Sequence, residues 1–330
     1  MNSADASSRM PGFSAFLPAS QTTDRTGRRS LLAGLASVPA LAMAGRAVGQ
    51  VYTAPPDLAS PVILNQSSSF ALRSHAGLDY RIFVSVPSGP APQGGFPVLY
   101  VTDGNAYFAA AAEVLRLQLL YSAGSFVQPM VVVGIGYPGE QPLDNKRRGV
   151  DLVHVAAGAG SPEWARYKAA SGGADAFLDF LVDELRPVLA ARYTLDAGRQ
   201  SLAGHSLGGL FTLHALSRRP MAFQSFAAIS PSIWVDEAGL SAAIDAMGAR
   251  LPGEAAISVL QMVADDEVPG QPARSAMMLS TARSMNQRLQ GLRPRGIRAR
   301  MAELPGENHM SSFFCALPAI LRQASVSPAA

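Results

Sequence analysis

The segment Gly204-His205-Ser206-Leu207-Gly208 constrains the fold more than any other part of this sequence of 330 residues. It follows the apolar run Gln200–Ala203, which is typical of a strand, and it opens Leu207–Arg218, where apolar residues recur at helical spacing. A G-x-S-x-G segment between a strand and a helix forms a tight turn, in which the glycines leave room and the serine hydroxyl is exposed. The sequence therefore predicts that Ser206 is a nucleophile.

The rest of the chain alternates between candidate strands and candidate helices. Short apolar runs typical of strands are Tyr80–Val86, Pro97–Thr102, Met130–Ile135, Gln200–Ala203, Phe226–Ile229, Ile257–Val263 and Ile297–Glu303. Helical patterns cover Ala106–Tyr121, Asp175–Tyr193, Leu207–Arg218 and Pro272–Leu289. Such alternation predicts an α/β fold, with a mainly parallel sheet and helices on both faces. Because about 285 residues follow residue 44, we expect residues 45–330 to form one such domain.

A nucleophilic serine needs a general base, and five histidines compete for this role. His205 adjoins the serine, but its side chain should leave the turn in another direction. His214 lies among apolar residues of the following helix, as a core histidine would, while His75 precedes the first strand and His154 lies in a loop. His309 follows the last predicted strand. In hydrolases with a G-x-S-x-G turn between a strand and a helix, the catalytic residues come in the order serine, acid, histidine along the chain, so the base is expected at this position. We therefore predict that His309 is the base.

The base is oriented by a carboxylate, which should follow a strand between Ser206 and His309. Asp265, Asp266 and Glu267 all stand directly after the predicted strand Ile257–Val263. Their positions in the sequence do not choose among them. One of the three is predicted to orient the base, and the other two are expected to be solvated loop carboxylates.

Two backbone amides are candidates for an oxyanion hole. The N–H of Leu207 lies at the start of the helix that follows the nucleophile, where helix N–H groups are available to an anion. A second donor is expected in the loop after an early strand, and Asn105 follows Pro97–Thr102 at the start of a predicted helix. Asp103 lies two residues before Asn105 in the same segment. It could be a helix-capping residue and not part of the site.

The N-terminal residues resemble an export signal. Arg28 and Arg29 precede the apolar stretch Leu31–Met43, whose 13 residues are fewer than the ~20 that span a bilayer, so no permanent membrane anchor is expected. Small residues follow at Ala40-Leu41-Ala42-Met43-Ala44. We predict that residues 1–44 form a twin-arginine signal, read by that export machinery and cleaved near Ala44 to leave a periplasmic protein. The alternative is a buried or disordered tail.

Composition excludes several classes of protein. Apolar residues make up 48% of the chain, enough for a substantial core, and 27 basic residues nearly balance 24 acidic ones without a basic cluster, so nucleic acid is not an expected partner. The single cysteine, Cys315, cannot form an internal disulfide and is expected in the core. Without a Cys/His cluster at zinc-ligand spacing, no metal or other cofactor is expected.

Motifs along residues 85–313 resemble the putative-esterase family of α/β-hydrolases, and within it the siderophore esterases that open enterobactin-type trilactones. They are Pro97-Val98-Leu99-Tyr100, Asp103-Gly104-Asn105, Gly134-Ile135-Gly136-Tyr137, Arg147-Arg148 with Asp151-Leu152, Gly172-Gly173-Ala174, residues 204–211, Ser230-Pro231-Ser232-Ile233-Trp234, Glu267 and His309. The resemblance implies an α/β-hydrolase fold, a serine esterase that forms an acyl-enzyme, and Glu267 as the acid.

A ferric catecholate siderophore is trianionic, so a site for it needs cationic side chains. Arg147 and Arg148 are expected in a loop near the active site, although one of them could instead pair with Asp151 and hold that loop. Trp234 is a candidate wall for a catechol ring, with core packing as its alternative. Three other functions stay open: a general carboxylesterase, an acyltransferase, and a siderophore-binding protein on a hydrolase fold.

Overall fold

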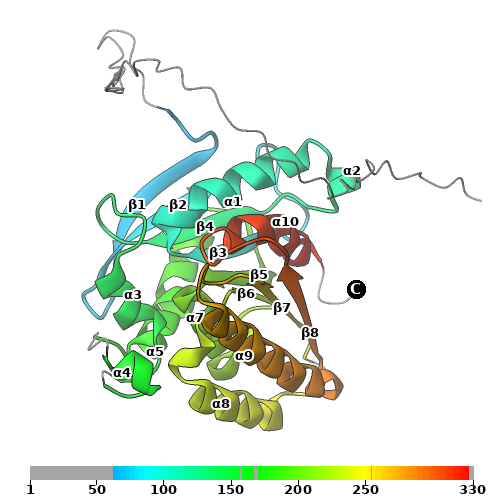
Figure 1. The fold of residues 1–330 in the computed structure, drawn as a ribbon. Helices are drawn as coiled ribbons and strands as arrows, with labels where there is room; N and C mark the ends of the chain where they lie inside the picture. The colour runs from blue at the N-terminus through cyan, green and yellow to red at the C-terminus, as the bar shows by residue number, and fades with distance from the viewer. Residues whose placement is uncertain (1–61, 157, 167–169, 254, 327–330) are drawn as a thin grey trace, which may run out of the picture. The chain divides into compact units, whose positions relative to one another are not determined.

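An eight-stranded sheet forms the centre of the fold, in the strand order β1-β2-β4-β3-β5-β6-β7-β8 (Figure 1). The computed structural model describes residues 62–330 apart from 157, 167–169, 254 and 327–330. Its strands are β1 (Ser67–Arg73), β2 (Asp79–Ser85), β3 (Phe96–Thr102), β4 (Val131–Gly136), β5 (Leu195–His205), β6 (Ser225–Ile229), β7 (Ile257–Ala264) and β8 (Ile297–Leu304). β2 is antiparallel to both β1 and β4, and all the other pairs are parallel. The predicted mainly parallel sheet is confirmed.

Helices cover both faces of this sheet, as predicted. They are α1 (Gly104–Leu119), α2 (Ser122–Ser125), α3 (Asn145–Leu152), α4 (Pro162–Arg166), α5 (Ala174–Asp179), α6 (Arg186–Ala190), α7 (Leu207–Arg218), α8 (Glu237–Arg250), α9 (Pro272–Gly291) and α10 (Ser312–Ser325). A π-helical turn, Phe180–Leu185, joins α5 to α6, so the helix predicted over Asp175–Tyr193 is interrupted by wider turns. In Figure 1, α1 and α10 lie on one face of the sheet, and α7, α8 and α9 lie on the other.

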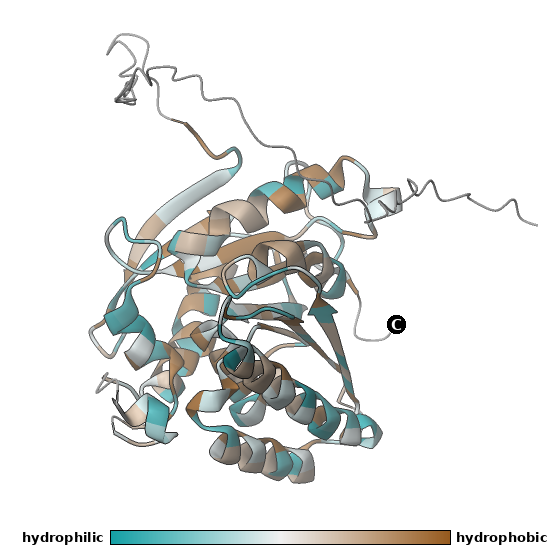
Figure 2. Cartoon of the chain, viewed as in Figure 1, coloured by the Kyte–Doolittle hydropathy of each residue, from teal (hydrophilic) through white to brown (hydrophobic). Residues whose placement is uncertain are grey.

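Two apolar layers hold the helices to the sheet. One joins α1 and α10 through residues such as Phe108 and Phe313, and the other joins α5, α7, α8 and α9 through residues such as Phe177 and Phe211. Figure 2 shows apolar residues on the central strands and polar residues on the outer sides of α8 and α9. Strands that are buried on both faces explain why β3 and β4 read as continuous apolar runs.

Cys315 is exposed, so the expectation that it lies in the core is wrong. Within α10, Phe313, Ala316 and Leu317 are buried against the sheet, and Cys315 lies on the opposite side of the helix with the exposed Phe314. A helix that covers a sheet buries only one stripe of its surface. Cys315 lies outside that stripe in α10 and is therefore exposed.

The compact unit that contains the sheet spans residues 61–330. The predicted signal of residues 1–44 and its cleavage site lie outside the described residues. Among the helices that the structure describes, none is long and apolar enough to cross a membrane. Across the same described ranges, no group of three or more His, Cys, Asp and Glu side chains could hold a metal ion.

Candidate active site

Ser206 lies in the turn between β5 and α7, where the sequence predicts a nucleophile. Its backbone has φ 58° and ψ −115°, a conformation that residues other than glycine rarely adopt. A Cβ atom at Gly204 would lie 2.2 Å from the carbonyl oxygen of Gly208, and one at Gly208 would lie 2.3 Å from Thr102 Oγ1. The two glycines of the motif are therefore required by close packing, of Gly204 against the backbone of Gly208 and of Gly208 against the Thr102 side chain, and the sequence predicts that they leave room in the turn.

A continuous chain of polar contacts leads from Ser206 to His309 and on to Glu267. Ser206 Oγ lies 2.9 Å from His309 Nε2, and His309 Nδ1 lies 2.6 Å from Glu267 Oε2. The backbone N–H of His309 also donates to the carbonyl oxygen of Glu267, at 3.1 Å. The structure thus brings together the predicted serine, the predicted histidine and one of the three candidate carboxylates.

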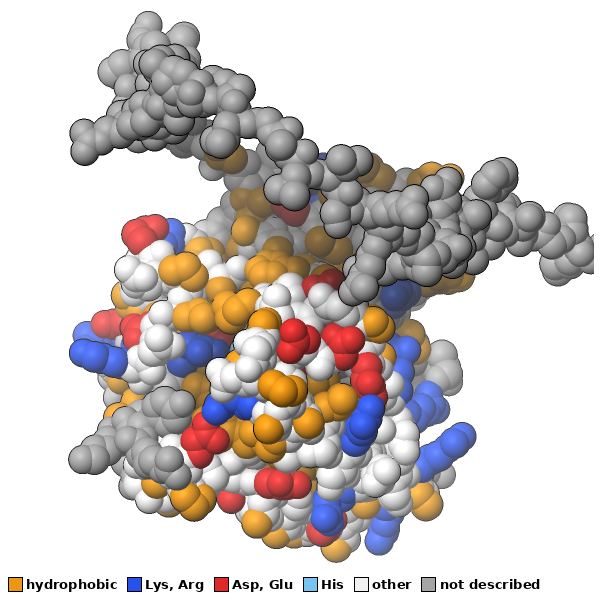
Figure 3. All heavy atoms as spheres, in the orientation of Figure 1, with side chains coloured by type: hydrophobic (Ala, Val, Ile, Leu, Met, Phe, Trp, Pro, Cys, Tyr) orange, Lys and Arg blue, Asp and Glu red, His pale blue; other side chains and the backbone are white. Residues whose placement is uncertain are grey.

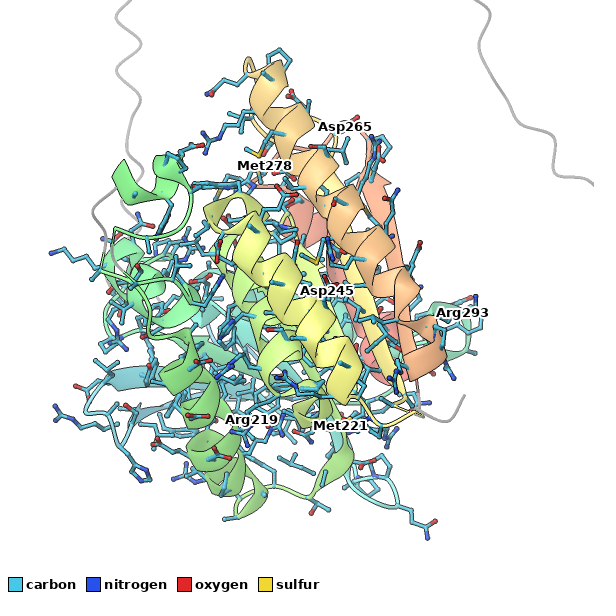
Figure 4. All side chains as sticks on the ribbon, turned by 90° about the horizontal axis from the view of Figure 1, so that it is seen from below. Arg219, Met221, Asp245, Asp265, Met278 and Arg293 are labelled. Atoms are coloured by element: carbon cyan, nitrogen blue, oxygen red, sulfur yellow. The ribbon has the colours of Figure 1, made fainter. Side chains whose placement is uncertain are left out.

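The other two carboxylates have different partners. Asp265 Oδ1 accepts the backbone N–H of Gly306 at 2.9 Å, and Asp266 Oδ1 lies 3.5 Å from Ser275 Oγ. Asp265 lies at the same end of the molecule as Met278 in Figure 4. Of the three candidate carboxylates, Glu267 is the one that contacts His309, and it is also the one that the resemblance implies.

Glu267 is buried, with 1% of its surface exposed, and its carboxylate is held on both oxygens. Oε1 accepts the hydroxyl of Ser230 at 2.5 Å and the backbone N–H of Ala264 at 2.9 Å, while Oε2 faces His309. A carboxylate accepts only, so His309 carries its proton on Nδ1 and leaves Nε2 to accept from the serine hydroxyl. Ser230 was not predicted as a site residue. The one signal in the sequence is its position directly after β6, and many residues share such a position.

The candidate oxyanion donors lie at neighbouring strand ends. β3 and β5 are adjacent and parallel, with Val101 opposite Ala203, so the start of α1 lies beside the turn at Ser206. The Asn105 side chain donates to the carbonyls of Tyr137 and Gly139, at 3.2 and 3.1 Å, and its Oδ1 accepts the N–H of Tyr137 at 2.8 Å. Since these contacts occupy the side chain, the backbone N–H of Asn105 is the group that stays a predicted donor to an oxyanion.

A cleft of about 490 Å³ opens in front of Ser206. Its lining comprises Ser206, Ser232, Trp234, Glu267, Val268, Pro269, Arg274, Met278, Asn308, His309 and Met310. Trp234 borders this cleft and also packs in part against the apolar core, and the guanidinium of Arg274 lies 5.2 Å from its ring centroid. Arg274, which also pairs with Glu163, was missed by sequence reasoning because nothing in the first turn of α9 shows which way its side chains point.

Arg147 and Arg148 lie elsewhere, which corrects two expectations. They belong to the helix α3, capped by the Asp144 carboxylate, and not to a loop. Arg148 is buried and donates from Nε to Asp103 Oδ1 at 2.8 Å, so it is not available to a substrate. Asp103 accordingly makes no helix-capping bond with its side chain. A buried carboxylate needs such a counter-charge, and this need explains the position of Arg148.

Arg147 is also occupied within the protein. Its guanidinium donates to Asp151 Oδ2 at 3.2 Å and to the carbonyl of Asp79 at 3.0 Å, and it lies 4.8 Å from the ring centroid of Tyr80. Neither arginine lines the cleft at Ser206. The alternative in which one arginine pairs with Asp151 is therefore the correct one, and the arginine is Arg147.

A second and larger cleft, of about 850 Å³, lies at the opposite end of the sheet. Its lining includes Arg293, Arg298 and Arg300, and Figure 3 shows basic side chains along this edge of the molecule. In Figure 4, Arg293 lies at one end of the helix layer, and Met278, which lines the smaller cleft, lies toward the other. Ligand sites of parallel α/β sheets lie at the carboxyl ends of the strands, and of these two clefts the smaller one lies there.

The fold and the polar chain at Ser206 are those of an α/β-hydrolase. A family model described as "Putative esterase" matches residues 74–324, so the chain belongs to this family, whose members are hydrolases of ester bonds. The "Ferri-bacillibactin esterase BesA" of Bacillus subtilis is 35% identical over 239 residues, which are 70% of this chain and 80% of the relative.

Two further comparisons agree with this family. The "Siderophore triacetylfusarinine C esterase" of Aspergillus fumigatus is 39% identical over 184 residues, 54% of this chain and 60% of that protein. The crystal structure of the "BES protein" from Bacillus cereus superimposes with a TM-score of 0.73 at 30% identity, covering 81% of this chain and 98% of that structure. The chain is thus related to siderophore esterases.

Proposed function

We propose that the protein is a serine esterase that hydrolyses the ester bonds of a catecholate siderophore trilactone. The observation that carries the proposal is the chain of contacts at the cleft, 2.9 Å from Ser206 Oγ to His309 Nε2 and 2.6 Å from His309 Nδ1 to Glu267 Oε2. A hydroxyl, an imidazole and a carboxylate in this order activate a serine for attack on an ester. The names of the related siderophore esterases support a siderophore ester as the substrate.

In the proposed first half-reaction, Ser206 Oγ attacks the ester carbonyl carbon while His309 Nε2 takes the hydroxyl proton. Glu267 stabilises the imidazolium that forms, and the backbone N–H groups of Leu207 and Asn105 donate to the developing oxyanion. The carbon–oxygen bond of the ester then breaks. The leaving alcohol takes the proton from His309, and the acyl group stays on the serine.

In the proposed second half-reaction, a water molecule replaces the alcohol. His309 takes a proton from this water as its oxygen attacks the acyl carbon, and the proton returns to Ser206 Oγ when the acyl bond breaks. The product is a carboxylic acid, and Ser206 is regenerated. Opening one ester of a trilactone in this way gives a linear chain with one acid and one alcohol end.

Arg274 is the cationic side chain that the cleft offers to an anionic substrate. It pairs with Glu163 and lies against Trp234, and unlike Arg147 it lines the cleft, where an anionic substrate would compete with Glu163 for its guanidinium. Arg274→Ala is expected to lower kcat/KM for a ferric trilactone by about tenfold and to change that for a neutral p-nitrophenyl ester little, with a smaller loss at high salt. Steady-state kinetics with both substrates measures this difference.

Arg283→Ala is the matched control, because Arg283 lies on the same helix but pairs with Glu303 and does not line the cleft. This control should leave both substrates unaffected. Equal losses for the two substrates in Arg274→Ala would assign the arginine a structural role.

The substrate is tested by incubating the protein with ferric trilactone siderophores and with p-nitrophenyl esters, and by identifying the products by mass spectrometry. The proposal predicts linear hydrolysed siderophore. Cleavage of the simple esters alone would indicate a general carboxylesterase, and transfer to an added alcohol would indicate an acyltransferase. Binding of the siderophore without turnover would indicate a binding protein.

We further propose that residues 1–44 direct export by the twin-arginine route and that the protein acts in the periplasm. The supporting observation is Arg28-Arg29 before the short apolar stretch Leu31–Met43. In a bacterial host, replacing both arginines by lysine should leave uncleaved precursor in the cytoplasm, whereas Arg25→Lys should not. Fractionation and N-terminal sequencing check this, and normal periplasmic accumulation of the double-lysine variant would contradict the proposal.

A further inference from the structure

His205, the residue before the nucleophile, makes two short contacts inside the protein. Its Nε2 lies 2.6 Å from the backbone carbonyl oxygen of His309, and its Nδ1 lies 2.8 Å from the hydroxyl of Tyr107. Both side chains are buried, since 1% of each residue is exposed. As predicted, His205 points away from the turn, but it points toward the backbone of the residue that supplies the imidazole to Ser206.

The directions of these two hydrogen bonds follow from the groups involved. A carbonyl oxygen only accepts, so Nε2 of His205 carries the proton and donates it to His309. Burial, followed by the nearby His309, lowers the pKa of His205 to about 3, and the ring is therefore neutral. A neutral ring has one N–H, so Nδ1 accepts from the hydroxyl of Tyr107.

The surroundings hold this arrangement in place from several elements. Tyr107 belongs to α1, and its ring lies 4.3 Å from that of Phe313 in α10. The same carbonyl of His309 also accepts the hydroxyl of Ser312 at 2.9 Å. The backbone of His309 is thus fixed by donors from both β5 and α10.

We propose that His205 is a positioning residue, which with Tyr107 fixes the His309 carbonyl and so keeps the His309 imidazole between Ser206 and Glu267. This inference rests on the proposed function, in which His309 is the base. A misplacement of about 1 Å at a reacting group can cost about 10²-fold in rate, so one hydrogen bond to the backbone of the base is enough to matter.

The test compares two substitutions of His205. In His205→Leu the donor is lost, and kcat for a p-nitrophenyl ester is expected to fall by about 10- to 100-fold with little change in KM. In His205→Gln a side-chain N–H can reach the place of Nε2, and most of the activity should return. Proton NMR adds a direct readout, because the Nδ1–H between His309 and Glu267 should give a far-downfield signal that His205→Gln keeps and His205→Leu loses.

Tyr107→Phe is the second variant, and it removes a single oxygen atom. Without the hydroxyl, Nδ1 of the buried His205 ring loses its hydrogen-bond donor, and the ring that donates to the His309 carbonyl is held less firmly, so kcat should fall by about three- to tenfold. This variant keeps the proposal testable if His205→Leu does not fold.

Two results would overturn the inference. One is wild-type kcat and an unchanged downfield signal in folded His205→Leu. The other, if that variant does not fold, is wild-type kcat in Tyr107→Phe. Failure of the proposed function looks different, since activity would then survive Ser206→Ala or His309→Ala.

Discussion

Ser206→Ala and His309→Ala are each expected to lower kcat for ester hydrolysis by roughly 10⁴- to 10⁶-fold. The first removes the atom that would carry the acyl group, and the second removes the group that would take its proton, at 2.9 Å. Because such residues act as a unit, the double variant should be hardly worse than either single variant. The small remaining rate would come from substrate binding and the backbone donors of Leu207 and Asn105.

Ser232→Ala is the matched control for this prediction. Its hydroxyl lies 3.2 Å from Ser206 Oγ and also lines the cleft, but it has no contact with His309 among the described hydrogen bonds. We expect this variant to keep kcat within about tenfold of the wild type. Near-normal kcat in Ser206→Ala, measured with a p-nitrophenyl ester and checked for contaminating esterase, would rule out the serine mechanism.

Glu267→Gln is expected to lower kcat by about 10³- to 10⁴-fold. The amide that replaces Oε2 could donate to His309 Nδ1, and the ring would then carry its proton on Nε2, where it cannot accept from Ser206. The oxygen of the amide stays at the Oε1 position, where it accepts from Ser230 and Ala264, and this directs the amide nitrogen toward His309. Single-turnover kinetics on folded protein measures the effect on acylation.

Asp265→Asn and Asp266→Asn are the controls, because their carboxylates contact Gly306 and Ser275 and not His309. Each should change kcat by less than about threefold, since neither faces the imidazole. A large loss in one of these variants with a mild loss in Glu267→Gln would transfer the role to an aspartate. Mild losses in all three would indicate that Ser206 and His309 act as a dyad.

The sheet and the nucleophile could be predicted because both depend on local patterns. Buried parallel strands give continuous apolar runs, and the turn at Ser206 requires its glycines. The edge strand β1 was missed because its sequence, Ser67–Arg73, is polar and mostly exposed or half-buried. Helix α10 was missed because Pro318 interrupts its pattern, and α8 because small residues separate its few buried apolar ones.

The choice of partners within the site could not be predicted from the sequence. Asp265, Asp266 and Glu267 are consecutive, and only the path of the turn shows that the first holds Gly306 while the third reaches His309. The arginines pose the same problem over longer distances. Arg148 is buried because it pairs with the buried Asp103. Arg274 lines the cleft although it belongs to α9, a helix whose sequence pattern predicts only packing against the sheet.

The central claim, that ester hydrolysis proceeds through a covalent bond to Ser206, is tested most directly by labelling with diisopropyl fluorophosphate. The serine oxygen attacks phosphorus and fluoride leaves, so the enzyme gains one stable phosphoryl group in place of the acyl group. Intact-mass spectrometry and peptide mapping should find a single adduct, located on Ser206, with ester hydrolysis lost in proportion to labelling. Hydrolysis that continues in fully labelled protein, or an inactivating adduct on another residue, would contradict the claim.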